Sequence, residues 1–390
     1  MGIDSGLTER EVITSAFGRA RTTSGWVRWR DALGGPAVAV ASLIAALIAT
    51  RSAGLPLRDP DGVASGRLGI AAGLVAGLVV VDILVRAWKR SPGLLPTAGA
   101  LLAVRRERWT SARVLPMSIA LLSFFASYFA YRNLKSVVPL LRPEELFDEK
   151  LENVDRAFFG GHDPSVLLHD LLGTGTAAHA MSFVYLLFFV FIPVSLAMTL
   201  VFSSDLRAGL FYTTAFSVNW LLGAASYFIL PSIGPFEATP GVFSGLPSTA
   251  ASQLQSLLLD ERIAFVRDPA AAGAAQGIGA FASLHVSVYV TAALAMHLLG
   301  FGRLAKASLW SLVGLTVAST VYLGWHYVID DIGGVAIAGL ALVLARVITG
   351  FDLSAARRMR QSAPGLVRRQ AETLLERPAA DGPRPRAVPD

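Results

Sequence analysis

The 390-residue chain contains no cysteine, which excludes disulfide bonds and metal sites built from thiolates. Charged residues are also scarce, because Asp, Glu, Lys and Arg together make up 16% of the chain, whereas soluble domains carry about 25%. Hydrophobic residues account for 53% of the chain, and the mean hydropathy is +0.54. This composition excludes an ordinary soluble domain and predicts a protein that crosses the membrane several times.

The formal net charge of +6 comes mostly from arginine. The basic residues cluster between apolar segments, which indicates membrane orientation rather than nucleic-acid binding. Residues 1–35 are polar and contain no hydrophobic signal-peptide region. We therefore expect residues 1–35 to form a cytoplasmic segment in front of the first span.

Eight apolar runs predict an all-α, polytopic membrane protein with about eight transmembrane helices. They cover residues 36–50, 68–85, 114–133, 180–202, 208–230, 285–301, 307–324 and 332–349. The first run is short, because a hydrocarbon core needs roughly 20 helical residues, so the sequence leaves open whether it spans fully. We divide the rest of the chain into two additional spans with a basic loop, a six-helix core and a basic tail, at residues 36–113, 114–350 and 351–390. The tail is rich in arginine and proline, and we expect it to be cytoplasmic and disordered toward its end.

The orientation of these spans follows from the loop at residues 86–113, which carries seven basic residues against the single acid Glu107. The positive-inside rule places this loop in the cytoplasm. With eight spans, both termini then lie in the cytoplasm, and segments 135–179 and 231–284 lie on the external face. Residues 144–179 are expected to form short amphipathic helices there. Segment 231–284 is too long for an ordinary connection, which favours a function for it.

A polar cluster interrupts the apolar background at residues 319–334. His326 and Asp330 are four residues apart, so on a helix they would lie on one face. A carboxylate can hold one imidazole nitrogen and leave the other free to attack an electrophile. Asp331 is an alternative partner for the histidine. The competing interpretation is a polar contact between helices, but an ionisable pair at the mouth of a membrane helix favours function.

Ser283 and His285 form a second polar group, at the start of the sixth apolar run. The N-terminus of a membrane helix directs backbone N–H groups, and here a hydroxyl, toward an anion. His285 can then donate a proton to a leaving oxygen. The alternative is a histidine that only caps the helix.

Lys135 and Arg142 form a third group, separated by seven residues. This is two helical turns, so both cations can point the same way unless Pro139 bends the segment. Two cations at a membrane exit can bind a phosphate, the arginine through paired hydrogen bonds and the lysine as a point charge. Anchoring of a helix end among lipid head groups is the alternative.

Together, the three groups resemble the three-part signature of the type-2 phosphatidic acid phosphatase superfamily. The matching motifs are Lys135-x6-Arg142-Pro143, Ser283-x-His285 and Ser319-x6-His326-x3-Asp330. The chain is most similar to the inositol phosphorylceramide synthase-like branch, through the proline-rich stretch 230–236, the Phe-x-Ser-Leu-His sequence and the stretch 322–330. The resemblance covers about residues 130–340, so the first two spans, the basic loop and the tail fall outside it.

This resemblance implies a catalytic role for the core at residues 114–350. His326 would be the nucleophile and form a phosphohistidine, Asp330 would orient it, and His285 would protonate the departing oxygen and later activate the acceptor. The phosphoryl oxygens would be bound by Lys135, Arg142 and Ser283. Such chemistry relies on positioning and electrostatic stabilisation, so the resemblance implies neither a metal nor another cofactor.

Two positions depart from the superfamily pattern. Thr320 stands where an arginine is usual, and Ala282 stands where a proline is usual. The missing arginine removes one expected phosphate ligand, although the synthase-like branch also tends to lack it. Arg262 or Arg267, in segment 231–284, are candidates to replace it.

The implied reaction is phosphoryl chemistry on a lipid-linked phosphate at the external face of the plasma membrane. The branch resemblance favours transfer of a phosphoryl or phospho-head-group to an alcohol such as a polyol, and the alternative is a lipid phosphate phosphatase that uses water. A transporter or scaffold is the interpretation from another class, since Asp82 and Asn219 lie inside apolar runs. Hydrogen bonds inside the helix bundle are the competing account of these two residues. The sequence does not specify the lipid or the oligomeric state.

Overall fold

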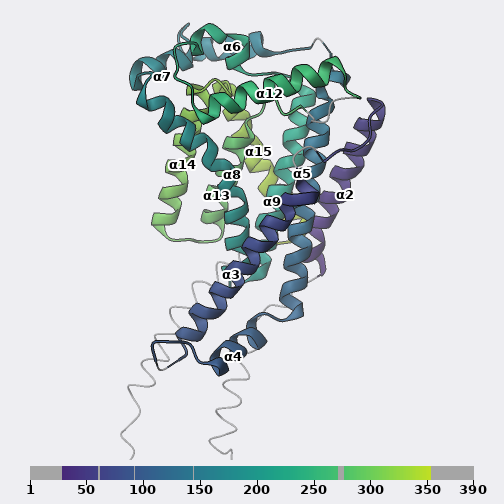
Figure 1. Ribbon diagram of the computed structural model, residues 1–390, viewed down its shortest axis with the longest axis vertical. Coiled ribbons are helices and arrows are strands. Elements are labelled where there is room, and N and C mark those ends of the chain that lie inside the picture. The colour runs from purple at the N-terminus through teal and green to yellow at the C-terminus, as the bar shows by residue number, and fades with distance from the viewer. Residues whose placement is uncertain (1–28, 60–61, 92, 144, 271–275, 353–390) are drawn as a thin grey trace, which may run out of the picture.

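The computed structural model describes residues 29–59, 62–91, 93–143, 145–270 and 276–352, and the structural statements below refer to these ranges. The described chain is helical throughout and contains no strand (Figure 1). Its α-helices are α2 (Trp29–Ser52), α3 (Leu68–Trp88), α4 (Ala98–Arg108), α5 (Ser111–Leu141), α6 (Asp148–Phe158), α7 (Pro164–Leu172), α8 (Thr176–Phe202), α9 (Leu206–Ile229), α10 (Pro235–Ala238), α11 (Pro240–Phe243), α12 (Ala250–Arg267), α13 (Leu284–Leu298), α14 (Arg303–Tyr322) and α15 (Val328–Thr349). A short π-helix covers Val63–Arg67. The prediction of an all-α polytopic membrane protein is confirmed.

Among the described residues, six helices are long and apolar enough to cross a membrane: α2, α3, α5, α8, α14 and α15. Helix α13 is apolar but has only 15 residues, and α9 has 24 residues, but no stretch of it reaches the hydropathy of the apolar stretches in those six. Most side chains of both helices are buried, because α9 and α13 pack against other helices of the bundle. A helix that faces protein rather than lipid needs less apolar surface, which explains why hydropathy alone does not identify these two.

The first span is longer than the apolar run at residues 36–50 indicates. Helix α2 begins at Trp29, and its apolar part covers Asp31–Ser52. Asp31 is only 2% exposed because its carboxylate pairs with Arg207 Nε at 3.0 Å. Residues 1–28 of the expected N-terminal segment and residues 353–390 of the expected tail lie outside the described residues.

The two ends of the bundle are built differently (Figure 1). Helices α6, α7 and α12 gather at one end, which we name the capped end, and α4 lies at the other, the α4 end. Helix α12 occupies residues for which the sequence predicted only a long polar connection. It begins at a capping box, in which Thr249 Oγ1 accepts a hydrogen bond from the N–H of Ser252. Its Leu254 and Leu258 pack against a buried cluster that includes Tyr322 and Trp325.

The polar residues inside the apolar runs are accounted for by contacts with other residues of the bundle. At the α4 end, Asp82 pairs with Arg86 Nε at 2.7 Å and with Arg108 Nε at 2.9 Å. Asn219 lies at the centre of α9, where its Nδ2 donates to Thr291 Oγ1 at 3.0 Å and its Oδ1 accepts from Ser287. These contacts join α3 to α4 and α9 to α13. They hold the helices together and do not line a path for a transported solute.

Candidate active site

His326 lies in the short connection between α14 and α15, just before the first turn of α15. Asp330 is in that first turn, and its Oδ2 atom lies 3.4 Å from His326 Nδ1. The two residues therefore meet, but not as neighbours on one helical face as their spacing suggested. Their contact joins a turn to the N-terminus of the following helix.

Burial dominates the protonation of His326, whose side chain is 5% exposed. Burial lowers the pKa of His326 from 6.5 to about 4; the positive charge of Lys135 acts in the same direction, while Asp331 and the backbone of Ala280 oppose the shift. At neutral pH the imidazole is therefore uncharged. An uncharged ring has the lone pair that nucleophilic attack requires.

Two carboxylates of α6 hold the loop around His326 in place. Asp155 accepts hydrogen bonds from the N–H groups of Val328 at 2.6 Å and Ile329 at 2.9 Å, which are the first two residues of α15. Asp148 accepts from the Tyr327 hydroxyl at 3.2 Å and from backbone N–H groups of residues 233 and 234.

Neither Asp148 nor Asp155 was predicted from the sequence to belong to the site. Their seven-residue spacing places both on one face of the amphipathic helix α6. That spacing was the available signal in the sequence, but it does not by itself distinguish a buried carboxylate from a solvated one.

Ser283 connects the second motif to the third. It precedes α13, where its Oγ caps the helix by accepting from the N–H of Val286 at 3.4 Å, and its own N–H donates to the carbonyl of Asp330 at 2.9 Å. The approach is close, because a Cβ atom added to Gly334 would lie 2.4 Å from the Ser283 carbonyl oxygen. A glycine at this position of α15 therefore permits the contact between the two motifs.

His285 faces His326 across the capped end, with ring centroids 5.9 Å apart and the planes tilted by 56°. Its ring stacks on Tyr185 at 4.3 Å and lies 4.0 Å from Phe188. Its Nε2 atom is buried and has no hydrogen-bond partner among the described residues. The aromatic neighbours thus fix the ring, and no described residue forms a hydrogen bond with this nitrogen.

Lys135 belongs to the same group of residues. Helix α5 continues through Pro139 to Leu141, so Lys135 lies within the helix, where it is 9% exposed. Its Nζ donates to the Tyr131 hydroxyl at 3.3 Å and lies 4.8 Å from the centroid of the Tyr227 ring. The ammonium is within electrostatic range of both His285 and His326.

Arg142 lies farther along the chain than Lys135, just after the end of α5. Seven residues separate the two along α5, which corresponds to about 10 Å along a helix axis. Arg142 forms an ion pair with Glu145 and donates to the backbone carbonyl of Phe228. The structure therefore does not place both cations against the histidines, and Arg142 lines a separate pocket together with Arg262.

The serine and threonine of the third motif form hydrogen bonds with other residues of the protein. Ser319 Oγ donates to the carbonyl of Met181 at 3.0 Å, and Thr320 Oγ1, at the position of the usual arginine, donates to Asp331 Oδ2 at 3.1 Å. Asp331 is 3% exposed and interacts electrostatically with His326. Two carboxylates, Asp330 and Asp331, therefore stand near the histidine.

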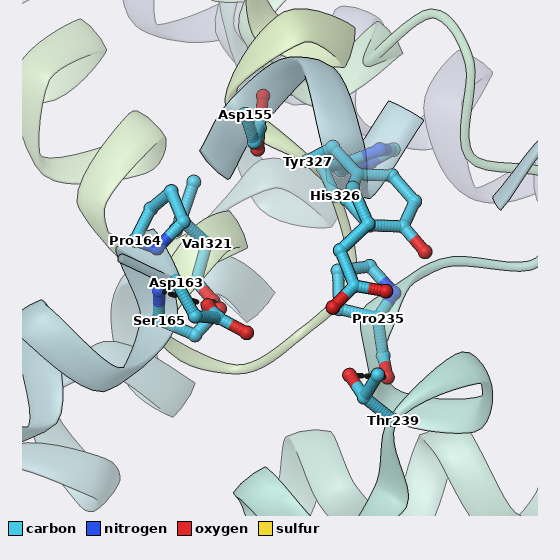
Figure 2. A pocket seen from close by; sticks show the side chains of 10 residues that line it. Asp155, Asp163, Pro164, Ser165, Pro235, Thr239, Val321, His326 and Tyr327 are labelled. Carbon is cyan, nitrogen blue, oxygen red and sulfur yellow. Dashed lines mark hydrogen bonds between the residues drawn. The ribbon is translucent and has the colours of Figure 1, made fainter. Parts of the chain in front are cut away.

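A pocket with about 260 Å³ of empty space, part of it open to solvent, reaches His326 (Figure 2). We name it the acidic pocket, because Glu152, Asp155 and Asp163 line it along with His326. In Figure 2, His326 and Tyr327 lie on one side of this pocket and Asp163 and Ser165 on the other. The proposed nucleophile is thus accessible from a pocket whose other charged groups are carboxylates.

A comparison with protein families matches residues 149–344 to the PAP2 superfamily. This range begins in α6 and ends in α15, so it contains Ser283, His285, His326 and Asp330 but neither Lys135 nor Arg142. Comparisons with curated proteins and with solved structures gave no match. The family match covers about half of the 390 residues and includes the two facing histidines, so the chain belongs to the PAP2 superfamily and is a membrane enzyme with lipid phosphatase or phosphotransferase activity on lipid phosphates.

Proposed function

We propose that this enzyme transfers a phosphoryl or phospho-head-group from a membrane lipid to an alcohol, as in the inositol phosphorylceramide synthase-like branch. The observation that carries the proposal is the pair of facing histidines, 5.9 Å apart, with Lys135 in electrostatic range of both. A candidate nucleophile, a candidate acid and a cation are thus close together. These are the groups that a covalent phosphoryl transfer requires.

In the first half of the reaction, the nitrogen of neutral His326 that does not face Asp330 attacks phosphorus and forms an N–P bond. The bond from phosphorus to the lipid oxygen breaks, and His285 protonates that oxygen as it leaves. Asp330, 3.4 Å from Nδ1, orients the attacking ring and stabilises the positive charge that develops on it. Lys135 and Ser283 stabilise the phosphoryl oxygens.

In the second half, His285 accepts the proton of the incoming hydroxyl. The hydroxyl oxygen attacks phosphorus, the N–P bond breaks, and His326 is regenerated as the neutral ring. The same residue can act as acid and then as base because each step restores the protonation state that the other needs.

The acidic pocket supports an alcohol as the acceptor. Carboxylates accept hydrogen bonds from hydroxyl groups, whereas they repel a second phosphate. Asp163 uses Oδ1 to accept from the N–H of Ser165 at 2.8 Å, and Glu152 pairs with Arg156 at 2.6 Å, so each carboxylate has a second oxygen for a ligand. Water fits the same pocket, and hydrolysis is therefore the competing outcome.

The proposed orientation places the capped end outside the cell and both termini in the cytoplasm of a plasma-membrane protein. The α4 end is strongly basic, which the positive-inside rule assigns to the cytoplasm. Its basic residues include Arg86, Lys89, Arg90, Arg105, Arg106 and Arg108.

The test uses purified protein with a panel of phosphate-labelled lipid phosphates and phosphodiesters, with and without added polyols and other alcohols. His326→Ala is compared with His297→Ala, a histidine near the opposite end of α13 that accepts a hydrogen bond from Trp310. A labelled phosphate ester of the added alcohol (a monoester from a lipid phosphate, a diester from a phosphodiester donor) that depends on His326 supports transfer. Free phosphate that depends on His326 supports a phosphatase instead, and turnover that survives His326→Ala overturns the assignment of the nucleophile.

A further inference from the structure

We infer that Tyr185 of α8 positions His285 as the acid, through a stack of three rings that also contains Trp325. We name this set of three side chains the ring stack. The inference rests on the proposed reaction, in which His285 protonates the leaving oxygen, and it assigns a role to a residue outside the three motifs. Because Tyr185 acts through His285, it is a positioning residue rather than a catalytic one.

Tyr185 stacks face to face on both of its partners. Its ring centroid lies 4.3 Å from that of His285, with the two planes tilted by 23°. The centroid of Trp325 is 4.8 Å away, and those planes are tilted by only 7°. Stacked rings attract one another beyond the effect of burial, so Tyr185 links the histidine to the tryptophan.

The two ends of the ring stack belong to the two halves of the site. His285 lies in the first turn of α13, whereas Trp325 directly precedes His326 in the connection between α14 and α15. The two imidazole centroids are 5.9 Å apart. Tyr185 therefore contacts one histidine directly and the chain neighbour of the other, so its ring influences how the two are placed relative to each other.

Other contacts already fix the Trp325 end of the ring stack. The N–H of Trp325 donates to the carbonyl of Thr320 at 2.9 Å, and the carbonyl of Gly324 accepts from the N–H of Phe236 at 2.9 Å. The Phe236 ring lies 5.5 Å from that of Trp325, and a Cβ atom added to Gly234 would lie 2.7 Å from the Trp325 carbonyl oxygen. Trp325 is thus held by two segments of the chain and gives Tyr185 a fixed surface to pack against.

The orientation of His285 depends on aromatic contacts. Its Nε2 atom forms no hydrogen bond with a described residue. The ring contacts Tyr185 at 4.3 Å and Phe188 at 4.0 Å, where the planes are tilted by 33°. Both residues belong to α8 and are about one turn apart. A non-aromatic side chain at position 185 would remove the more parallel of these two contacts and give the imidazole room to tilt.

The stacked face of Tyr185 also suits the charge of a proton donor. His285 must carry a proton before it can protonate the leaving oxygen. The ammonium of Lys135 repels that proton, whereas the face of an aromatic ring attracts a cation. Tyr185 therefore favours both the orientation and the charged form that the acid needs.

The test needs controls for folding, because Tyr185 is 3% exposed and belongs to the packed interior. Tyr185→Phe keeps the ring and removes only the hydroxyl. Tyr212→Leu removes another buried ring, since Tyr212 is 0% exposed and packs on Phe216 with the centroids 4.5 Å apart. Tyr212 lies near the start of α9, toward the α4 end. Tyr212→Leu is therefore the matched control for Tyr185→Leu.

The first experiment measures single-turnover formation of the phosphoenzyme from two esters, dodecyl phosphate and p-nitrophenyl phosphate. In both, His326 attacks phosphorus and the bond from phosphorus to the ester oxygen breaks. The dodecyl oxygen takes the proton of His285 as it leaves, whereas p-nitrophenolate leaves as a stable anion and needs no proton. Tyr185→Leu should slow the reaction of the dodecyl ester at least about 10-fold, which is part of the roughly 100- to 10,000-fold that a general acid contributes. The reaction of the nitrophenyl ester should slow less than about 3-fold.

The controls decide how these rates are interpreted. Tyr185→Phe should match the wild type on both esters, and Tyr212→Leu should change the two rates by the same factor. Equal losses on both esters in Tyr185→Leu, or a Tyr185→Phe protein as slow as Tyr185→Leu, would overturn the inference. His285→Ala is measured alongside them. If it slows both esters equally, His285 is not the acid, and the inference falls together with that part of the proposed reaction.

A second measurement examines the ring stack without any reaction. The protein is prepared with isotope-labelled histidine, and the NMR signal of the His285 ring is identified by its loss in His285→Ala. An aromatic ring shifts the signals of protons above its face upfield, so Tyr185→Leu should move this signal downfield. Tyr185→Phe and Tyr212→Leu should leave it in place. A signal that does not move in Tyr185→Leu overturns the inference and leaves the proposed reaction unaffected.

Discussion

Replacing Asp155 by alanine tests whether α6 positions the proposed nucleophile. The carboxylate of Asp155 is 3% exposed and accepts hydrogen bonds from Val328 and Ile329 at 2.6 and 2.9 Å. A hydrogen bond to a charged group contributes about 1.5 to 3 kcal/mol. The two hydrogen bonds to Asp155 together therefore stabilise the start of α15 by about 3 to 6 kcal/mol. Alanine removes both acceptors and leaves two buried N–H groups without partners.

The expected consequence is a loss of catalytic geometry at His326, which lies two residues before Val328. A displacement of about 1 Å at a reacting group costs about 100-fold in rate. We therefore expect Asp155→Ala to lower kcat about 100-fold with a smaller change in KM, because Asp155 binds the backbone at the start of α15. Asp155→Asn retains one acceptor oxygen and should fall between alanine and the wild type.

The assay is turnover of a labelled lipid phosphate, combined with single-turnover trapping of the phosphorylated enzyme. Glu149→Ala is the control, because Glu149 is exposed on the same helix. A slower rate of phosphoenzyme formation at saturating substrate identifies a positioning role. A folded Asp155→Ala protein that forms the phosphoenzyme at the wild-type rate would refute the reasoning.

Two further predictions concern pH and packing. Burial lowers the pKa of His326 to about 4, so the ring is neutral above that pH. The acid limb of kcat/KM should therefore lie near pH 4 rather than 6.5. At higher pH the rate should fall again because the proton donor is lost, which gives a bell-shaped profile. An acid limb centred near 6.5 under conditions where chemistry is rate-limiting would contradict this account. Gly334→Ala places a methyl group 2.4 Å from the carbonyl oxygen of Ser283, which should cost about 1 to 3 kcal/mol and lower activity at least 10-fold. Gly339→Ala, on the same helix with no atom within 4 Å of the added carbon, should leave activity intact, and equal activity of the two variants would show that the close approach is unimportant.

The lipid-facing helices were predictable because length and apolarity are local properties of the sequence. The start of α2 was not predictable in this way. Asp31 lowers the hydropathy of the first turn, and its partner Arg207 lies far along the chain. Helix α12 was not predicted, because its Leu254 and Leu258 pack against a buried cluster that includes Tyr322 and Trp325 and that forms only when the chain folds.

The same distinction applies to the candidate site. The chemistry of His285, His326 and Asp330 could be inferred from residue type and spacing, and the structure brings these three residues together. Asp148 and Asp155 could not be inferred, because they bind backbone N–H groups 85 and 173 residues away, respectively. Every residue except proline has a backbone N–H group, so the residue type does not indicate which N–H group will bind a carboxylate.

The polar centre of α9 has a consequence for how the chain enters the membrane during synthesis. Asn219 finds its partners Ser287 and Thr291 only 68 and 72 residues later. At about 5 to 20 residues per second, the ribosome needs roughly 4 to 14 seconds to supply that stretch. During this interval the Asn219 amide N–H has only the carbonyl of Ala215, on the same helix, as a partner, and the amide oxygen lacks the hydroxyl donors that α13 supplies. The complete hydrogen-bond network of Asn219 can therefore form only after α13 has been synthesised.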